Sequence, residues 1–85
     1  MGFSKTLLVN KKILITGAGK GIGRACAILA AKCGANVIAV ARTQSDLDEL
    51  TSLYPNNIEC WKMDINDDAF ITKLKSLSSL HGLIN

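Results

Sequence analysis

The stretch KILITGAGKGIGRACAILAAKCG, residues 12–34, carries three structural signals in direct succession. It opens with the β-branched apolar run KILIT at 12–16, which is typical of a buried strand. Glycines follow at 17, 19, 21 and 23. From Ile22 onward, small and apolar residues recur at three- and four-residue spacing, which predicts a helix that Gly34 ends. Its expected buried face comprises Ile22, Ala25, Cys26, Leu29, Ala30 and Cys33.

The next segments continue the alternation of strands and helices. NVIAVA at 36–41 is a continuous apolar run, as expected for a strand with helices on both faces of its sheet. Ser45 and Asp48 fit a capping box at the start of a second helix. The apolar stripe of that helix comprises Leu47, Leu50, Leu53 and Tyr54, and Pro55 follows it.

IECWKM at 58–63 predicts a third strand, and GLIN at 82–85 begins a fourth. Between them we expect a helix with Asp64 or Asn66 as its N-cap. The expected buried side of that helix comprises Phe70, Ile71, Leu74 and Leu77. The order β-α-β-α-β-α-β predicts an α/β fold with a parallel sheet and right-handed crossovers.

Length and composition bound the number of domains. The chain has 85 residues, of which 48% are hydrophobic and 20% charged, with one proline. These values describe one globular unit rather than a disordered chain. A complete doubly wound, or Rossmann, fold needs two β-α-β-α-β halves. We therefore expect residues 1–85 to be the N-terminal portion of a single dinucleotide-binding domain, truncated before its catalytic half.

Charge is divided unevenly along the chain. Residues 1–45 carry seven bases and no acid, while residues 46–85 carry three bases and all seven acids, within a net charge of +3. This asymmetry suggests an anionic partner for the first half. We do not expect nucleic acid, because the bases do not line one helix and aromatic residues are too few for base stacking.

Membrane and metal signals are weak. The longest apolar stretch, Ala25–Ala31, is far below the roughly 20 residues that cross a bilayer. Three cysteines without a CxxC motif favour free thiols in a reducing compartment, so we expect a cytoplasmic protein without a metal site. Cys26 and Cys33 are interpreted as small buried hydrophobic residues.

The position of the glycines between strand and helix decides their chemical meaning. Gly17, Gly21 and Gly23 match G-x-x-x-G-x-G, whereas the G-x-G-x-x-G register would need glycine or alanine at Ile22. Backbone N–H groups at a helix start are unpaired and bind a pyrophosphate where no Cβ blocks its approach. A purely structural turn is the alternative. The strand-loop-helix context favours dinucleotide binding.

The end of the second strand bears on which dinucleotide is bound. An acidic residue there would hydrogen-bond the ribose of NAD, but this chain has Arg42 and Thr43. An arginine and a hydroxyl hold a 2′-phosphate instead, and Lys20 in the glycine loop adds a second positive charge. Lys20 and Arg42 as ordinary solvated charges are the alternative. The pattern favours NADP(H).

These residues resemble the short-chain dehydrogenase/reductase family. Thr16–Gly23 is similar to its TGxxxGxG loop, Asp64 to the aspartate that contacts adenine, and Gly82–Asn85 to the lead into its NNAG motif. Residues 17–24 and 41–50 most resemble the branch that reduces L-xylulose and dicarbonyl compounds. The expected cofactor-binding residues are Gly17, Lys20, Gly21, Ile22, Gly23, Arg42, Thr43, Asp64 and Asn85.

Other candidates have simpler interpretations. Asp64 also suits an N-cap and Asn85 a strand end. His81 is expected to satisfy carbonyls at a helix end, and Trp61 to cover part of the core. The family's general acid is a tyrosine with lysine four residues later. Four residues after Tyr54 is Ile58, so we expect no catalytic residue in this chain.

The resemblance implies a function for a longer parent protein. That protein would pass hydride between NADPH and a small carbonyl substrate, using a tyrosine whose pKa a lysine lowers, and would form a homo-oligomer. Residues 1–85 would supply the adenosine and pyrophosphate half of the cofactor site. The alternative is a non-catalytic module that senses NADP(H).

Overall fold

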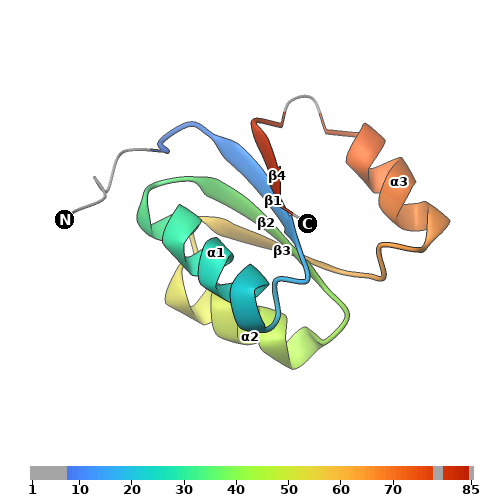
Figure 1. Ribbon diagram of the computed structural model, residues 1–85, viewed down its shortest axis with the longest axis horizontal. Coiled ribbons are helices and arrows are strands. Elements are labelled where there is room, and N and C mark those ends of the chain that lie inside the picture. The colour runs from blue at the N-terminus through green and yellow to red at the C-terminus, as the bar shows by residue number, and fades with distance from the viewer. Residues whose placement is uncertain (1–7, 78–79, 85) are drawn as a thin grey trace.

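A computed structural model describes residues 8–77 and 80–84. Four parallel strands form one sheet in the order β3-β2-β1-β4 (Figure 1). The elements, in chain order, are β1 (Lys12–Thr16), α1 (Gly21–Lys32), β2 (Asn36–Ala41), α2 (Gln44–Leu53), β3 (Ile58–Lys62), α3 (Asp68–Lys75) and β4 (Gly82–Ile84). The predicted α/β class and element order are confirmed.

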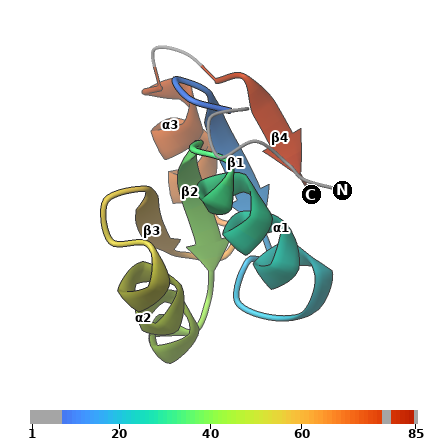
Figure 2. The ribbon, with the colours of Figure 1, turned by 90° about the vertical axis from the view of Figure 1, so that its left-hand side faces the viewer.

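The sheet is covered on both faces. Figure 2 shows α1 and α2 on one side of the strands and α3 on the other. Successive residues of β2 serve the two layers in turn: Val37 and Ala39 pack toward α1 and α2, while Ile38 and Val40 pack toward α3. The strand is continuously apolar because neither of its faces meets water.

Helix α1 buries only part of the expected face. Ala30 and Cys33 are buried as predicted and Ala27 and Ala31 are buried beside them, while Ile22 is 83% exposed and Leu29 is also exposed. Small side chains let the helix axis approach the sheet closely, so the alanine side packs inward and the larger apolar side chains face away. The end of the helix follows the prediction, with a Schellman pair of hydrogen bonds from Gly34 to Ala31 and from Ala35 to Ala30.

The predicted capping box of α2 is wrong. The helix begins at Gln44 with Thr43 as its N-cap, so Ser45 lies inside the first turn, and no side chain makes a capping hydrogen bond. Asp48 instead accepts a hydrogen bond from the Gln44 side chain, one turn earlier, at 2.8 Å. Leu47 and Leu50 are fully buried, but Leu53 is 50% exposed at the end of the helix.

The start of α3 also differs from the expectation. Asp67, not Asp64 or Asn66, holds the N-cap position. Asp64 Oδ1 accepts the Asn66 N–H at 2.9 Å, which shapes the turn between β3 and α3. Phe70, Leu74 and Leu77 pack on the sheet as predicted, whereas Ile71 is exposed because it lies on the outer side of the helix.

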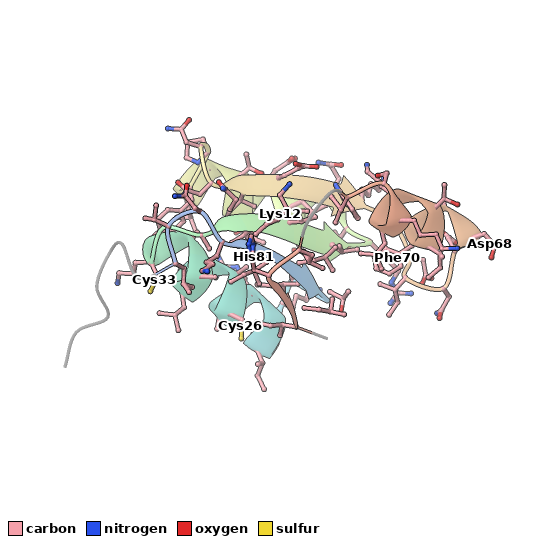
Figure 3. The ribbon with its side chains drawn as sticks, turned by 90° about the horizontal axis from the view of Figure 1, so that it is seen from above. Lys12, Cys26, Cys33, Asp68, Phe70 and His81 are labelled. Carbon is pink, nitrogen blue, oxygen red and sulfur yellow. The ribbon has the colours of Figure 1, made fainter. Side chains whose placement is uncertain are left out.

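Two further side chains are placed by partners distant in sequence. Trp61 is buried with its ring edge-on to Phe70 at 6.5 Å, as the core role predicts. The interpretation of His81 is wrong, because α3 ends at Lys75 and His81 lies beside the start of β1 (Figure 3). The His81 Nδ1 accepts the backbone N–H of Lys12 at 3.0 Å, and the backbone N–H of His81 donates to the Lys12 carbonyl at 2.8 Å.

The remaining expectations concern thiols, the last strand and the membrane. All three cysteines are free, with Cys33 buried and Cys26 half-buried. The strand predicted at 82–85 is observed to Ile84, and Asn85 lies outside the described residues. In the described parts of the chain, no helix is both long and apolar enough to cross a membrane.

Candidate functional site

A cleft of about 460 Å³ lies where β1, β2 and β3 end. Crevices at the carboxyl ends of parallel strands are the usual ligand sites of open α/β sheets. Five of the expected cofactor-binding residues line this cleft, namely Gly17, Lys20, Arg42, Thr43 and Asp64. Gly21, Ile22 and Gly23 lie just beyond it in the first turn of α1, and Asn85 is outside the described residues.

The glycine loop needs glycine for two separate reasons. Gly17 and Gly21 have positive φ angles of 63° and 58°, a conformation that residues with a side chain rarely adopt. At Gly23 the reason is space, because a Cβ there would overlap the backbone carbonyl of Gly17. The Ala18 N–H also donates to the Val40 carbonyl at 3.1 Å, which ties the loop to the end of β2.

The first turn of α1 is open to an anion. Lys20 is the N-cap residue, no side chain caps the helix, and the first turn carries no acid. The leading N–H groups of a helix have no partner within it and lie at the positive end of its dipole. Together with a loop free of Cβ atoms at Gly17, Gly19 and Gly21, this arrangement fits a pyrophosphate group.

The other wall of the cleft carries the residues that follow β2 and β3. Arg42 Nη1 lies 3.9 Å from Asp64 Oδ2, and the Arg42 side chain is 79% exposed. Thr43 follows at the N-cap position of α2, with its hydroxyl making no cap hydrogen bond. A guanidinium and a hydroxyl are therefore accessible beside the glycine loop, and they suit a phosphate ester.

Sequence reasoning did not include Gly19 or Asp46 of this cleft among the cofactor-binding residues. Asp46, in the first turn of α2, lies against Gly19, where an added Cβ would stand 2.8 Å from Asp46 Oδ2. Both residues line the cleft. The signal for Asp46 was its spacing, because a helix that starts directly after Arg42-Thr43 places its first turn over the same strand ends.

The family model for short chain dehydrogenases matches residues 11–85. The chain belongs to the short-chain dehydrogenase family. L-xylulose reductase of Mesocricetus auratus is 42% identical over 79 residues, covering 92% of this chain and 32% of the relative. D-erythrulose reductase of Gallus gallus is 47% identical over 58 residues, covering 68% and 23%. The chain thus spans about a third of the length of the L-xylulose reductase that it matches.

Solved structures of short-chain dehydrogenases have the same arrangement of strands and helices. A short-chain dehydrogenase of Shigella flexneri complexed with NADP superposes with a TM-score of 0.79 at 26% identity, covering 96% of this chain and 39% of that one. The citronellol catabolism dehydrogenase of Pseudomonas aeruginosa gives a TM-score of 0.83 at 26% identity, covering 98% and 38%. The predicted Rossmann architecture and family membership are confirmed.

Metal chemistry has no candidate centre in the described residues. Across 8–77 and 80–84, no group of three or more His, Cys, Asp or Glu side chains is arranged to hold an ion. Tyr54 is half-buried at the end of α2, where it packs on the core formed with α1.

Proposed function

We propose that this chain binds the adenosine, pyrophosphate and 2′-phosphate portion of NADP(H). The observation that carries the proposal is that Lys20, Arg42 and Thr43 line the same cleft as the glycine loop. The N–H groups at the start of α1 would hold the pyrophosphate. Lys20, Arg42 and the Thr43 hydroxyl would hold the 2′-phosphate, and Asp64 would contact the adenine.

The carbonyl substrate is proposed from the relatives. Those at 42% and 47% identity are named L-xylulose reductase and D-erythrulose reductase, and both names refer to reductases of small ketoses. We infer that residues 1–85 form the cofactor-holding first portion of one domain of such a reductase, active on L-xylulose-like or α-dicarbonyl compounds. NADPH supplies the hydride when bound, and the protein orients it. Cytoplasmic location and a homo-oligomeric state belong to the same proposal.

A second candidate function is a non-catalytic NADP(H)-sensing module. Lys20, Arg42 and Thr43 line the cleft and are residue types that bind phosphate, so the cleft by itself supports cofactor binding. A protein of this kind would bind the cofactor and report its presence without turnover.

The first test compares two ligands that differ only at the 2′ position. Isothermal titration calorimetry on the full 85-residue chain would measure dissociation constants for 2′-phospho-ADP-ribose and ADP-ribose. Two charge-assisted contacts to the phosphate predict binding at least about tenfold tighter for the phosphorylated ligand. Equal dissociation constants would contradict the NADP(H) assignment. If neither ligand binds, the proposed site itself is wrong.

The second test separates reductase from sensor. A protein that joins this chain to a segment with Tyr-x-x-x-Lys is assayed for NADPH oxidation with L-xylulose and with an α-dicarbonyl compound. Oxidation that depends on the carbonyl compound supports the reductase. NADPH binding without oxidation, in every protein that carries the chain, would favour the sensing module.

A further inference from the structure

The side chains that line the cleft carry balanced charges. Lys20 and Arg42 are positive, and Asp46 and Asp64 are negative, so these four side chains sum to zero. A wall with a net positive charge would attract any phosphate, but these four side chains give the wall no net charge. Discrimination between phosphorylated and unphosphorylated ribose must therefore depend on where each charge lies.

The two acids of the cleft differ in their surroundings. Asp64 lies 3.9 Å from Arg42 and also accepts the Asn66 N–H, so nearby donors offset its charge. The Asp46 carboxylate has neither a hydrogen bond nor an ion pair to any residue in the described part of the chain. It is the acid of the cleft whose charge is not offset by a side chain.

Asp46 lines the cleft together with the segments that carry the cationic residues. Its carboxylate lies against Gly19, and Lys20 is the next residue of the loop. Arg42 and Thr43 immediately precede α2, in whose first turn Asp46 lies. The carboxylate therefore stands at the junction of the two segments that are proposed to hold the 2′-phosphate.

A carboxylate at this junction has opposite effects on the two forms of the ribose. It repels a 2′-phosphate, which carries more than one negative charge at neutral pH. It accepts a hydrogen bond from a free 2′-hydroxyl. We propose that Asp46 is a specificity-determining residue that limits the preference of the cleft for the 2′-phosphate and lets it also hold unphosphorylated NAD(H).

A simpler role for Asp46 is helix stabilisation, because an acid in the first turn interacts favourably with the helix dipole. That role would change the unfolding temperature and would affect both ligands equally. The specificity role changes the ratio of the two dissociation constants. The two roles are separated by measuring both quantities.

The test uses Asp46→Asn in the full chain, with Asp48→Asn as the matched control. Asp48 is exposed on the same helix and lies outside the cleft. Its replacement makes the same change in net charge as Asp46→Asn but leaves the lining of the cleft unchanged. The probes are 2′-phospho-ADP-ribose and ADP-ribose, measured by calorimetry at low and high salt. Asp46→Ser, with its smaller side chain, guards against an effect of the amide group.

We expect D46N to bind 2′-phospho-ADP-ribose roughly tenfold more tightly and ADP-ribose no more tightly, with the gain shrinking at high salt. Asp48→Asn should change the ratio of dissociation constants by less than about twofold. A ratio in D46N equal to that in D48N would overturn the inference, as would equal weakening of both ligands.

This inference rests on the proposed function, and the two fail in distinguishable ways. If the unmodified chain binds neither ligand, both are wrong. If the unmodified chain binds the phosphorylated ligand more tightly and D46N leaves the ratio unchanged, the inference alone is wrong and the NADP(H) site stands.

Discussion

A methyl group on Gly23 would overlap the backbone carbonyl of Gly17, so the first turn of α1 packs directly against the start of the glycine loop. This contact brings two backbones together six residues apart in sequence. It fixes the curvature of the loop and the position of the helix N-terminus relative to β1. A flexible side chain could move aside, but a carbonyl held between β1 and α1 cannot do so without shifting both elements.

Gly23→Ala should therefore destabilise the chain, because the loop must open to admit the methyl group. Overpacking in a tight site costs about 1–3 kcal/mol or more. Urea unfolding measures the free energy change, and calorimetry with 2′-phospho-ADP-ribose should give weaker binding. Gly82→Ala is the control, since its Cβ would meet the Ile13 side chain at an ordinary 3.6 Å. Equal stability of the two variants would show that the loop accommodates the methyl group.

Arg42→Ala should weaken binding of 2′-phospho-ADP-ribose by about tenfold to a hundredfold, the worth of one charge-assisted hydrogen bond. ADP-ribose should bind almost as before, because it lacks the group that Arg42 is proposed to hold. Lys32→Ala removes one positive charge at the far end of α1 and serves as control. A similar loss for both ligands in Arg42→Ala would argue against a 2′-phosphate contact.

Leu50→Ala should cost about 2–5 kcal/mol of unfolding free energy, because Leu50 is fully buried between α2 and the sheet. Leu53→Ala, three residues later on the same helix, should cost less than about 1 kcal/mol, since the side chain already meets water. Chemical denaturation of both variants provides the comparison. Costs of the same size would mean that the end of α2 is packed more tightly than its exposure indicates.

His81→Ala should loosen the start of the pairing between β1 and β4. It removes the acceptor of the Lys12 N–H, a loss of about 0.5–1.5 kcal/mol. Amide hydrogen exchange at Lys12 should become faster by up to about tenfold. His81→Asn is the control, because its side-chain carbonyl is still an acceptor. Unchanged exchange in His81→Ala would mean that another group protects this amide.

Much of the fold could be predicted because its signals are local. The strands of a parallel sheet are buried on both faces, so KILIT and NVIAVA stand out as continuous apolar runs. The observed β1 and β2 have the bounds predicted from those runs. The glycines mark the turn because Gly17 and Gly21 adopt a backbone conformation that side chains disfavour.

The helix faces and caps were harder, because they depend on what each helix meets. Either side of α1 is apolar, so periodicity alone did not distinguish the alanine side that packs from the side with Ile22 and Leu29. The capping prediction at Ser45 failed since the chain leaves β2 directly into α2 at Gln44. Each helix start follows from the end of a strand rather than from one residue's capping preference.

The sequence by itself determined the order of elements, the family and the glycine loop, because each is encoded in a contiguous pattern of residues. Only the tertiary structure decided that His81 pairs with Lys12, 69 residues away, and that Asp46 lies against Gly19. The contact of Asp46 with Gly19 arises because parallel strands bring their carboxyl ends, and the loops that follow them, to one edge of a sheet. The contact of His81 with Lys12 lies at the opposite edge, where β1 and β4 begin side by side. The charge balance of the cleft therefore follows from strand order and helix position.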